Sequence, residues 1–213
     1  MRLLSPLEAR VLGVLVEKQH TVPDTYPMSL NALVGGCNQK TARSPVIEAT
    51  DADVLGALDG LKGLSLVFEG SSSRVVKFEH NTARVLLVPS QAVALLAVLM
   101  LRGPQTSAEL RLNCERLHRF ADISSVEGFL DELAAKATPM VVKLPRAAGE
   151  REARWAHLLC GEVAMPAARP AAADEGVSAG ELSALRAEQT RLAVEVAELR
   201  QLVQRMAQEL GMH

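Results

Sequence analysis

The sequence predicts a mainly α-helical protein with small β-hairpins, an α+β fold of two tandem winged helix-turn-helix domains and a C-terminal coiled-coil helix. Three observations point to this fold class. The order helix, short helix, helix and hairpin occurs twice, the two third helices share a residue pattern, and the end of the chain carries a heptad repeat. The expected domains are residues 1–85 and 86–163, which are followed by a linker at 164–180 and the coiled-coil helix at 181–213.

The first expected helix covers residues 5–18. Ser5 can accept the free N–H groups of its first turn, and Glu8 completes a capping box with it. Pro6 suits the first helical position because its φ already matches the helix and it has no N–H to leave unpaired. The apolar side chains that recur at helical spacing, and that we expect to face the core, are Leu7, Val11, Val14 and Leu15.

The rest of the first domain lies in residues 26–80. A short helix leads into the polar loop GGCNQKTARSP, and a third helix follows, which Thr50 or Asp51 can cap and which Gly63 ends. A hairpin with the turn sequence GSSS forms the expected wing. The short helix is expected at 29–34 and the two strands at 66–69 and 75–79.

The second domain repeats this order of elements. Ser90 can cap its first helix, which Gly103-Pro104 ends, and a second capping box opens the helix after it at Thr106. The remaining elements are a third helix at 123–136 and a hairpin that pairs 140–144 with 153–158.

The two third helices share a register, which is the main evidence for the repeat. The matching positions are Val54, Gly56, Leu58, Asp59 and Leu61 in the first and Val126, Gly128, Leu130, Asp131 and Leu133 in the second. We interpret the match as a repeat of structure more than of sequence. Two unrelated amphipathic helices that share this pattern are the alternative.

A heptad repeat runs through the end of the chain. Apolar side chains alternate steps of three and four from Leu182 to Leu210, with Gln189 as one polar a position. β-Branched residues at a with Leu at d, and opposite charges at e and g, favour a parallel homodimer. A helix that packs back on its own chain is the alternative. The expected dimer contacts are Leu185, Gln189, Leu192, Val196, Leu199, Val203 and Met206.

Composition and motifs argue against a membrane protein and an enzyme. The longest apolar run, Ala92–Leu101, is too short to cross a bilayer, and the three cysteines have no framework spacing, so we expect a cytoplasmic protein. No phosphate-binding loop, nucleophile elbow or paired-carboxylate motif is present. The best zinc candidate combines Cys114 and His118 with His157 and Cys160, two pairs that would have to meet in space. We therefore expect no catalysis, no cofactor and no metal.

The charge pattern gives a mixed signal for nucleic acid. The net charge is −2, and the third helices, which enter the major groove in most winged-helix proteins, are acidic here. The cations lie on loops and wings, where a dimeric, transcription-regulator-like protein could contact phosphates of double-stranded DNA. An adaptor that binds another protein is the alternative, and a merely solvated surface is a further one. The expected DNA contacts are Asn38, Gln39, Lys40, Arg43, Arg74 and Lys77, with Lys40 and Arg43 exposed on their loop.

The chain resembles the YceH family of bacterial proteins. The resemblance rests on TVPDTYPMSLNALVGGCNQKTARSPV, SRVVKFEHN, LRGPQTSAELR, RLHRFADISSVEGFLDEL and EARWAHLLCGE, and it covers roughly residues 3–163. It implies two winged-helix domains, a functional surface around the CNQKTARSPV loop, and no activity or catalytic residue that could be carried over. Asn31 and Asn38 can equally serve to brace this loop. Phe78 stands where the family pattern has Tyr, which removes one hydroxyl group.

Overall fold

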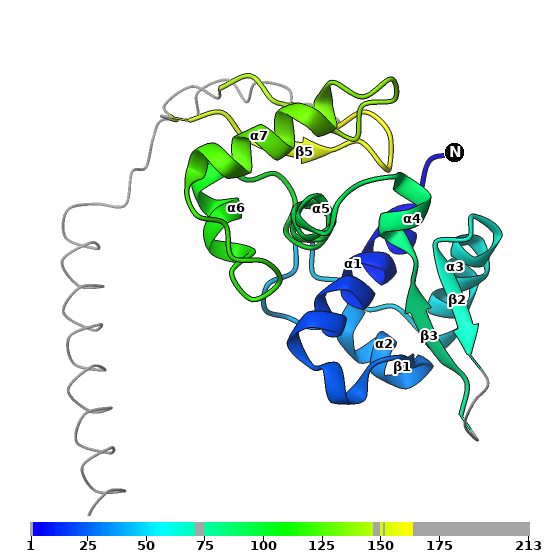
Figure 1. Cartoon of the computed structure of the whole chain (residues 1–213). Coiled ribbons are helices and arrows are strands. Elements are labelled where there is room, and N and C mark those ends of the chain that lie inside the picture. Colours follow the sequence, from blue (N-terminus) through cyan, green and yellow to red (C-terminus); the bar gives the residue numbers. More distant parts are fainter. Residues whose placement is uncertain (1, 71–74, 147–149, 151, 164–213) are drawn as a thin grey trace, which may run out of the picture. The chain divides into compact units, whose positions relative to one another are not determined.

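A computed structural model of the chain describes residues 2–70, 75–146, 150 and 152–163, which belong to one compact unit, Met1–Ala164. This unit combines α-helices with two small antiparallel sheets (Figure 1), so the predicted mixture of helices and hairpins is confirmed. The expected linker at 164–180, the coiled-coil helix at 181–213 and the tip of the first hairpin with Arg74 lie outside the described residues.

The first half of the unit contains the expected helices and hairpin, together with elements that the sequence did not predict. The helices are α1 (Pro6–Thr21), α2 (Leu30–Cys37) and α3 (Asp51–Gly63), and the hairpin strands are β2 (Val67–Gly70) and β3 (Lys77–His80). The additional elements are a 3-10 turn at Pro23–Thr25, the strand β1 (Met28–Ser29) and the helix α4 (Thr82–Leu86).

Capping boxes fix where the predicted helices begin. At α1, the Glu8 N–H donates to Ser5 Oγ at 3.1 Å while the Ser5 N–H donates to Glu8 Oε2 at 2.7 Å. Thr50 and Asp53 make the same reciprocal pair at α3, which settles its cap as Thr50. The expectation that Ser90 caps the first helix of the second half is wrong, because Ser90 is itself the first helical residue there.

The first sheet has the strand order β1-β3-β2. Phe78 on the central strand pairs with Met28 on one side and Glu69 on the other, and its ring is buried. Phe78 lacks the hydroxyl group of the Tyr that the family pattern has here. Its ring packs among apolar side chains, which need no hydrogen bond from this position. The neighbouring position on β2, Phe68, lies half exposed.

The second half repeats the order of three helices and a hairpin. Its elements are α5 (Ser90–Arg102), α6 (Ser107–Asn113), α7 (Ile123–Ala134), β4 (Val141–Lys143) and β5 (Trp155–His157). Gln105 extends the second sheet by one bridge, because its backbone N–H and C=O both pair with Trp155.

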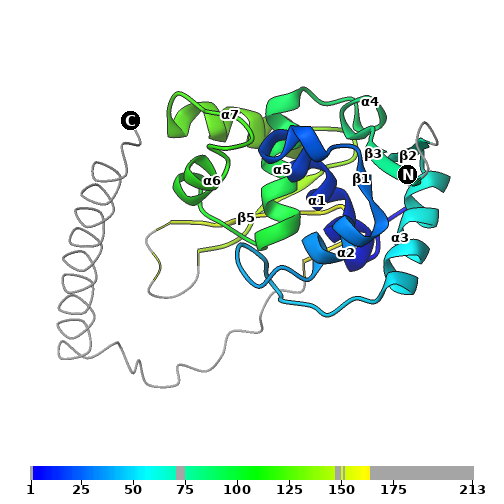
Figure 2. The same ribbon diagram turned by 90° about the horizontal axis from the view of Figure 1, so that it is seen from below.

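Helix α5 lies against α1 at the centre of the unit, as the two views in Figures 1 and 2 agree. Every residue of α5 from Ala92 to Leu101 is buried, as expected for a helix that is apolar all round. Gly13 allows the close approach, because a Cβ on it would lie 3.0 Å from the Leu101 side chain. No helix among the described residues is long and apolar enough to cross a membrane.

Candidate nucleic-acid interface

The loop between α2 and α3, residues 38–50, holds four of the six expected DNA contacts. Asn38 does not face solvent with its amide: Nδ2 donates to the Ala49 carbonyl at 2.8 Å, and Oδ1 accepts from the Ala49 N–H at 2.7 Å. The side-chain amide thereby satisfies both backbone hydrogen-bonding groups of Ala49, on the far side of the loop. Asn38 therefore braces the loop, which is one of the two roles that the sequence left open for it.

Arg43 is not exposed, and this expectation is wrong. None of its side-chain surface is accessible, and its Nη2 lies 2.6 Å from Glu17 Oε2 on α1. Nη1 lies 3.1 Å from Glu17 Oε1, and Nε donates to the Gly36 carbonyl at 3.1 Å. The loop folds back onto α1 because this fork satisfies both the guanidinium and the carboxylate. Arg43 therefore cannot reach a phosphate.

Glu17 stays ionised in this contact. Burial alone raises the pKa of its carboxyl group, but the hydrogen bonds and charge of Arg43, helped by Lys18, outweigh burial and lower the pKa overall. Gln39 belongs to the same cluster, since its Oε1 accepts from Lys18 and Arg43 at 3.4 Å and its Nε2 donates to Thr41 at 3.2 Å.

A second buried guanidinium, that of Arg10, fixes the other side of the loop. Its Nη1 donates to the Cys37 carbonyl at 3.1 Å and its Nη2 to the Pro45 carbonyl at 2.6 Å. Burial raises the pKa of the neighbouring Cys37 thiol to about 11, although both guanidiniums act against this rise. Arg10 therefore ties the end of α2 and the following loop to α1, and the Cys37 thiol is neutral.

Only two cations of the expected set face solvent among the described residues. Lys40 is exposed at the tip of the loop, and Lys77 lies half buried at the start of β3. Neither side chain forms a hydrogen bond or ion pair within the described part of the chain. Arg74, the other cation of the expected set, lies outside that part of the chain.

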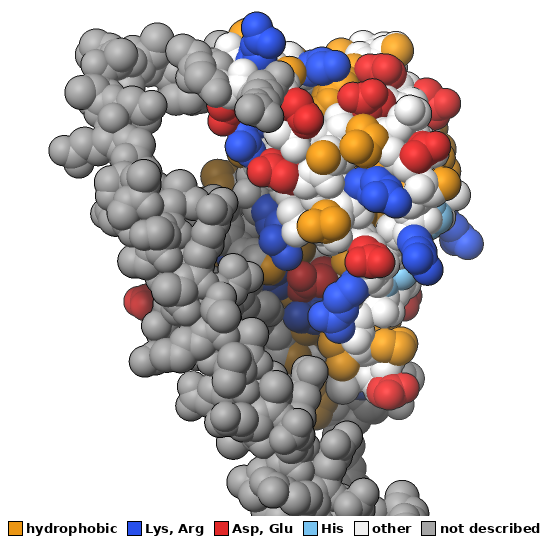
Figure 3. Space-filling view, turned by 90° about the vertical axis from the view of Figure 1, so that its left-hand side faces the viewer, with side chains coloured by type: hydrophobic (Ala, Val, Ile, Leu, Met, Phe, Trp, Pro, Cys, Tyr) orange, Lys and Arg blue, Asp and Glu red, His pale blue; other side chains and the backbone are white. Residues whose placement is uncertain are grey.

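The structure draws attention to three arginines that our sequence analysis did not select. Arg111 lies on α6, and Arg116 and Arg119 lie on the segment that connects α6 to α7. All three are exposed, and none pairs with a carboxylate among the described residues, although Arg111 donates to the Ala121 carbonyl at 3.0 Å. Figure 3 views the side of the unit that carries α6 and shows Lys and Arg side chains interspersed with Asp and Glu side chains over it. The arginine-rich run RLNCERLHR at residues 111–119 was the sequence feature from which these three arginines could have been selected.

The second hairpin, whose strand β4 packs against α7, carries two further exposed cations. Lys143 and Arg146 are exposed and line a hollow of about 540 Å³ that also contains Ile123 and Glu127 from α7. The Lys143 ammonium lies 5.3 Å from the centre of the Trp155 ring, which holds the side chain in place. We name Arg111, Arg116, Arg119, Lys143 and Arg146 together the cationic surface.

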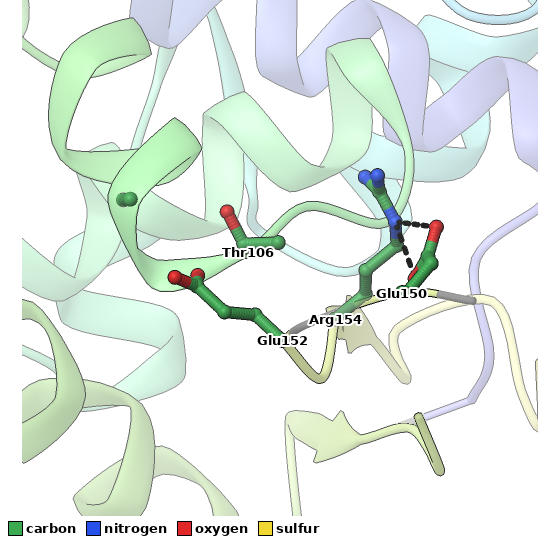
Figure 4. Close-up of a pocket in the computed structure, with 5 residues that line it drawn as sticks. Thr106, Glu150, Glu152 and Arg154 are labelled. Atoms are coloured by element: carbon green, nitrogen blue, oxygen red, sulfur yellow. Dashed lines mark hydrogen bonds and ion pairs between the residues drawn. The ribbon is translucent and has the colours of Figure 1, made fainter. Parts of the chain in front are cut away.

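Arg154, on the same hairpin, is unavailable because acidic side chains surround it. Its Nη1 lies 2.9 Å from Glu109 Oε2, and its Nε lies 3.1 Å from Glu150 Oε1. Arg154 and Glu150 line a hollow of about 330 Å³ with Thr106 and Glu152 (Figure 4). Within the described ranges, no three His, Cys, Asp or Glu side chains gather in a way that could hold a metal ion.

The exposed faces of the third helices are acidic, as expected. Asp51 and Asp59 are exposed on α3, and Asp131 and Glu132 are exposed on α7. Leu55 lies among the acidic groups of α3 and is 42% exposed. Carboxylates on these faces disfavour contact with phosphate groups.

Comparison with known proteins identifies the family of the chain. Residues 4–151 match the family described as "Protein of unknown function, DUF480". The chain is 68% identical over 213 residues to a UPF0502 protein of Burkholderia multivorans, covering 99% of this chain and 91% of that protein. It is also 68% identical over 214 residues to a UPF0502 protein of Cupriavidus pinatubonensis, covering 99% and 92%. The chain thus belongs to the DUF480 family, whose members include these UPF0502 proteins, as the resemblance to the YceH family predicted.

Proposed function

We propose that this protein is a non-enzymatic, dimeric winged-helix protein that binds double-stranded DNA through the phosphate backbone. The observation that carries this proposal is the cationic surface. Its five positive side chains are exposed, and none forms an ion pair in the described part of the chain, although, besides the hydrogen bonds from Ser125, the charge of Arg111 helps to lower the pKa of the Asp122 carboxyl group. Such groups gain most from binding phosphate, because condensed counterions are released when they neutralise the DNA.

The proposed winged-helix assignment is supported by the order of elements. In each half, two helices precede a third helix that opens with an N-capping side chain, Thr50 in one and Asp122 in the other, and an antiparallel hairpin follows. In this arrangement the segment before the third helix and the hairpin lie beside the DNA. Arg116 and Arg119 occupy the first of these positions in the second half, Lys143 and Arg146 occupy the second, and Arg111 lies on the preceding helix α6.

Backbone contact suits this chain better than base reading. The third helices would have to bring Asp59 or Asp131 close to phosphates in order to enter a groove, which costs Coulomb energy. Contacts from loops and hairpins avoid that cost, and phosphate contacts carry little sequence information. A dimer formed through the heptad segment would double the cations, so that modest contacts from each copy add up.

The proposal is tested by removing charge from the cationic surface. We expect the double variant Arg116→Ala with Arg119→Ala to weaken binding to all duplexes alike and to reduce the salt slope by about one for each phosphate that the variant no longer neutralises. Arg84→Ala is the matched control, because Arg84 is also exposed but lies on α4. Equal weakening by the double variant and the control would contradict a localised interface.

A second candidate function, that of a protein-interaction adaptor, is favoured by the open face of α3. Leu55 is exposed there between acidic side chains, and nothing lies within 4 Å of a Cβ built on Gly56. A basic, apolar partner would suit this face. Leu55→Arg should abolish capture of such a partner and leave DNA binding intact, whereas the double arginine variant should do the reverse.

A further inference from the structure

A small hollow of about 80 Å³, which we name the arginine hollow, lies at the end of α6. Its walls come from α6 and from the segment that connects α6 to α7, and most of its lining residues are charged. Its volume is well below the few hundred cubic ångströms of a pocket for a whole small molecule, so it suits one compact chemical group. The lining residues are Arg111, Leu112, Glu115, Arg119 and Phe120.

Packing and backbone hydrogen bonds fix the shape of the arginine hollow. Phe120 is buried, and its ring makes edge contacts with the rings of His118 and Phe129, at centroid distances of 4.7 and 5.9 Å. The turn before it is closed because the N–H groups of Leu117 and His118 both donate to the Cys114 carbonyl, at 2.7 and 2.8 Å. An occupant would therefore bind without the cost of ordering this segment.

Two guanidinium groups line the arginine hollow, and neither forms an ion pair within the described part of the chain. Arg111 Nη2 donates to the Ala121 carbonyl at 3.0 Å, which holds this guanidinium beside the turn and leaves other N–H groups to donate. Arg119 has neither a hydrogen bond nor an ion pair among the described residues. Glu115 also lines the hollow, but it lies outside ion-pair distance of both arginines, so the lining keeps a net positive charge.

We propose that the arginine hollow holds one phosphate group of the DNA backbone, and that Arg111 and Arg119 donate to its oxygens. This assignment rests on the DNA-binding function proposed above and names the contact that positions the cationic surface on the duplex. A guanidinium can donate two parallel N–H groups to a phosphate, whereas an ammonium acts as a point charge. Leu112, which is 71% exposed on the wall of the hollow, would pack against the neighbouring sugar.

Inorganic phosphate tests the arginine hollow in the absence of DNA. When the full chain is titrated with phosphate at constant ionic strength, the side-chain N–H signals of Arg111 and Arg119 should show saturable NMR shifts. The signal of Arg84, which is exposed on α4, should not shift. Glu115→Gln should tighten phosphate binding at least about twofold, because it removes a negative charge from the wall. Shifts of equal size at all three arginines, or shifts that do not saturate, would overturn the proposal.

A substitution that preserves charge tests whether the phosphate belongs to DNA. Arg119→Lys keeps the positive charge but loses the paired N–H groups, so it should weaken duplex binding at least about fivefold more than Arg116→Lys does. Arg116 is exposed on the same segment, outside the arginine hollow. Equal weakening by the two variants would overturn the assignment to DNA and leave the proposed function intact. If the wild type bound inorganic phosphate in the hollow but no duplex, the proposed function would fail and the phosphate site would stand.

Discussion

At the scale of single residues, Arg43 changes the interpretation of the polar loop most. Two buried guanidiniums brace this loop, and each donates to two backbone carbonyls, while that of Arg43 also pairs with Glu17. The polar residues of the loop therefore hold its shape. Lys40 at the exposed tip is the one cation of the described loop that can contact a ligand.

Removing Glu17 should be strongly destabilising, because it leaves the buried Arg43 charge uncompensated. We expect Glu17→Ala to lower the free energy of unfolding by about 3 kcal/mol, as measured by urea denaturation. Lys40→Ala removes an exposed side chain from the same loop and should change stability by less than about 0.5 kcal/mol. Similar small effects for both variants would contradict a structural role for the Arg43–Glu17 pair.

Two histidines should make the fold sensitive to acid. Burial lowers the pKa of His157 to about 4, and the pKa of His80 to about 4, where nearby His20 adds a smaller effect. Since the pKa of histidine in an unfolded chain is about 6.5, the unfolded state binds more protons between these values. Stability should be fully present above about pH 6.5 and should decrease as the pH falls toward 4.

The check is urea denaturation at several pH values for the wild type and for His157→Gln. The substitution should reduce the decrease in stability between neutral pH and about pH 5, because one neutral buried imidazole no longer has to become charged. An unchanged decrease in the variant would show that His157 does not cause the acid sensitivity.

At the scale of elements, two adjacent glycines in α2 illustrate how tightly the first half is packed. A Cβ on Gly36 would lie 2.6 Å from Cγ1 of the fully buried Val14, whereas nothing lies within 4 Å of a Cβ on Gly35. Both changes to alanine gain the same helix propensity, so they differ only in the available space. Gly35→Ala should stabilise the fold by up to about 1 kcal/mol, and Gly36→Ala should destabilise it by about 1–3 kcal/mol. Thermal unfolding of the pair provides the measurement, and equal shifts would contradict the packing.

The elements with strong local signals were predictable from the sequence, and those that depend on distant partners were not. Ser5, Thr50 and Thr106 open helices through capping boxes that a few neighbouring residues define. Strand β1 is very short, and its pairing with Phe78 joins segments that are far apart in the sequence, so the prolines around it indicated only a turn. Arg43 was misjudged for the same reason, since its partner Glu17 lies on another element.

At the scale of the whole molecule, the candidate site depends on arrangement more than on any single motif. Arg111, Arg116 and Arg119 lie close together in a sequence that is nearly neutral overall, and only the structure shows that all three are exposed and outside ion-pair distance of a carboxylate among the described residues. Sequence reasoning could place cations on loops and hairpins. Sequence reasoning could not show which of these cations form ion pairs within the protein, as Arg43 and Arg154 do.

The heptad segment makes a separate prediction for the whole molecule. Deletion of residues 181–213 should halve the molar mass measured by light scattering, because the a and d side chains of a parallel dimer are then removed. The same deletion should weaken DNA binding, since two linked copies contact more phosphates than one. An unchanged mass would rule out the proposed coiled-coil dimer.

The most direct test of the central proposal is fluorescence anisotropy of a labelled duplex of about 30 base pairs with random sequence, titrated with the full chain at about 50 and 200 mM salt. We predict binding at the lower salt concentration that weakens by at least about a hundredfold at the higher one, as expected for roughly four phosphate contacts or more. Absence of binding at the lower salt concentration, where phosphate contacts are strongest, would contradict the DNA-binding function and leave the adaptor as the function to pursue.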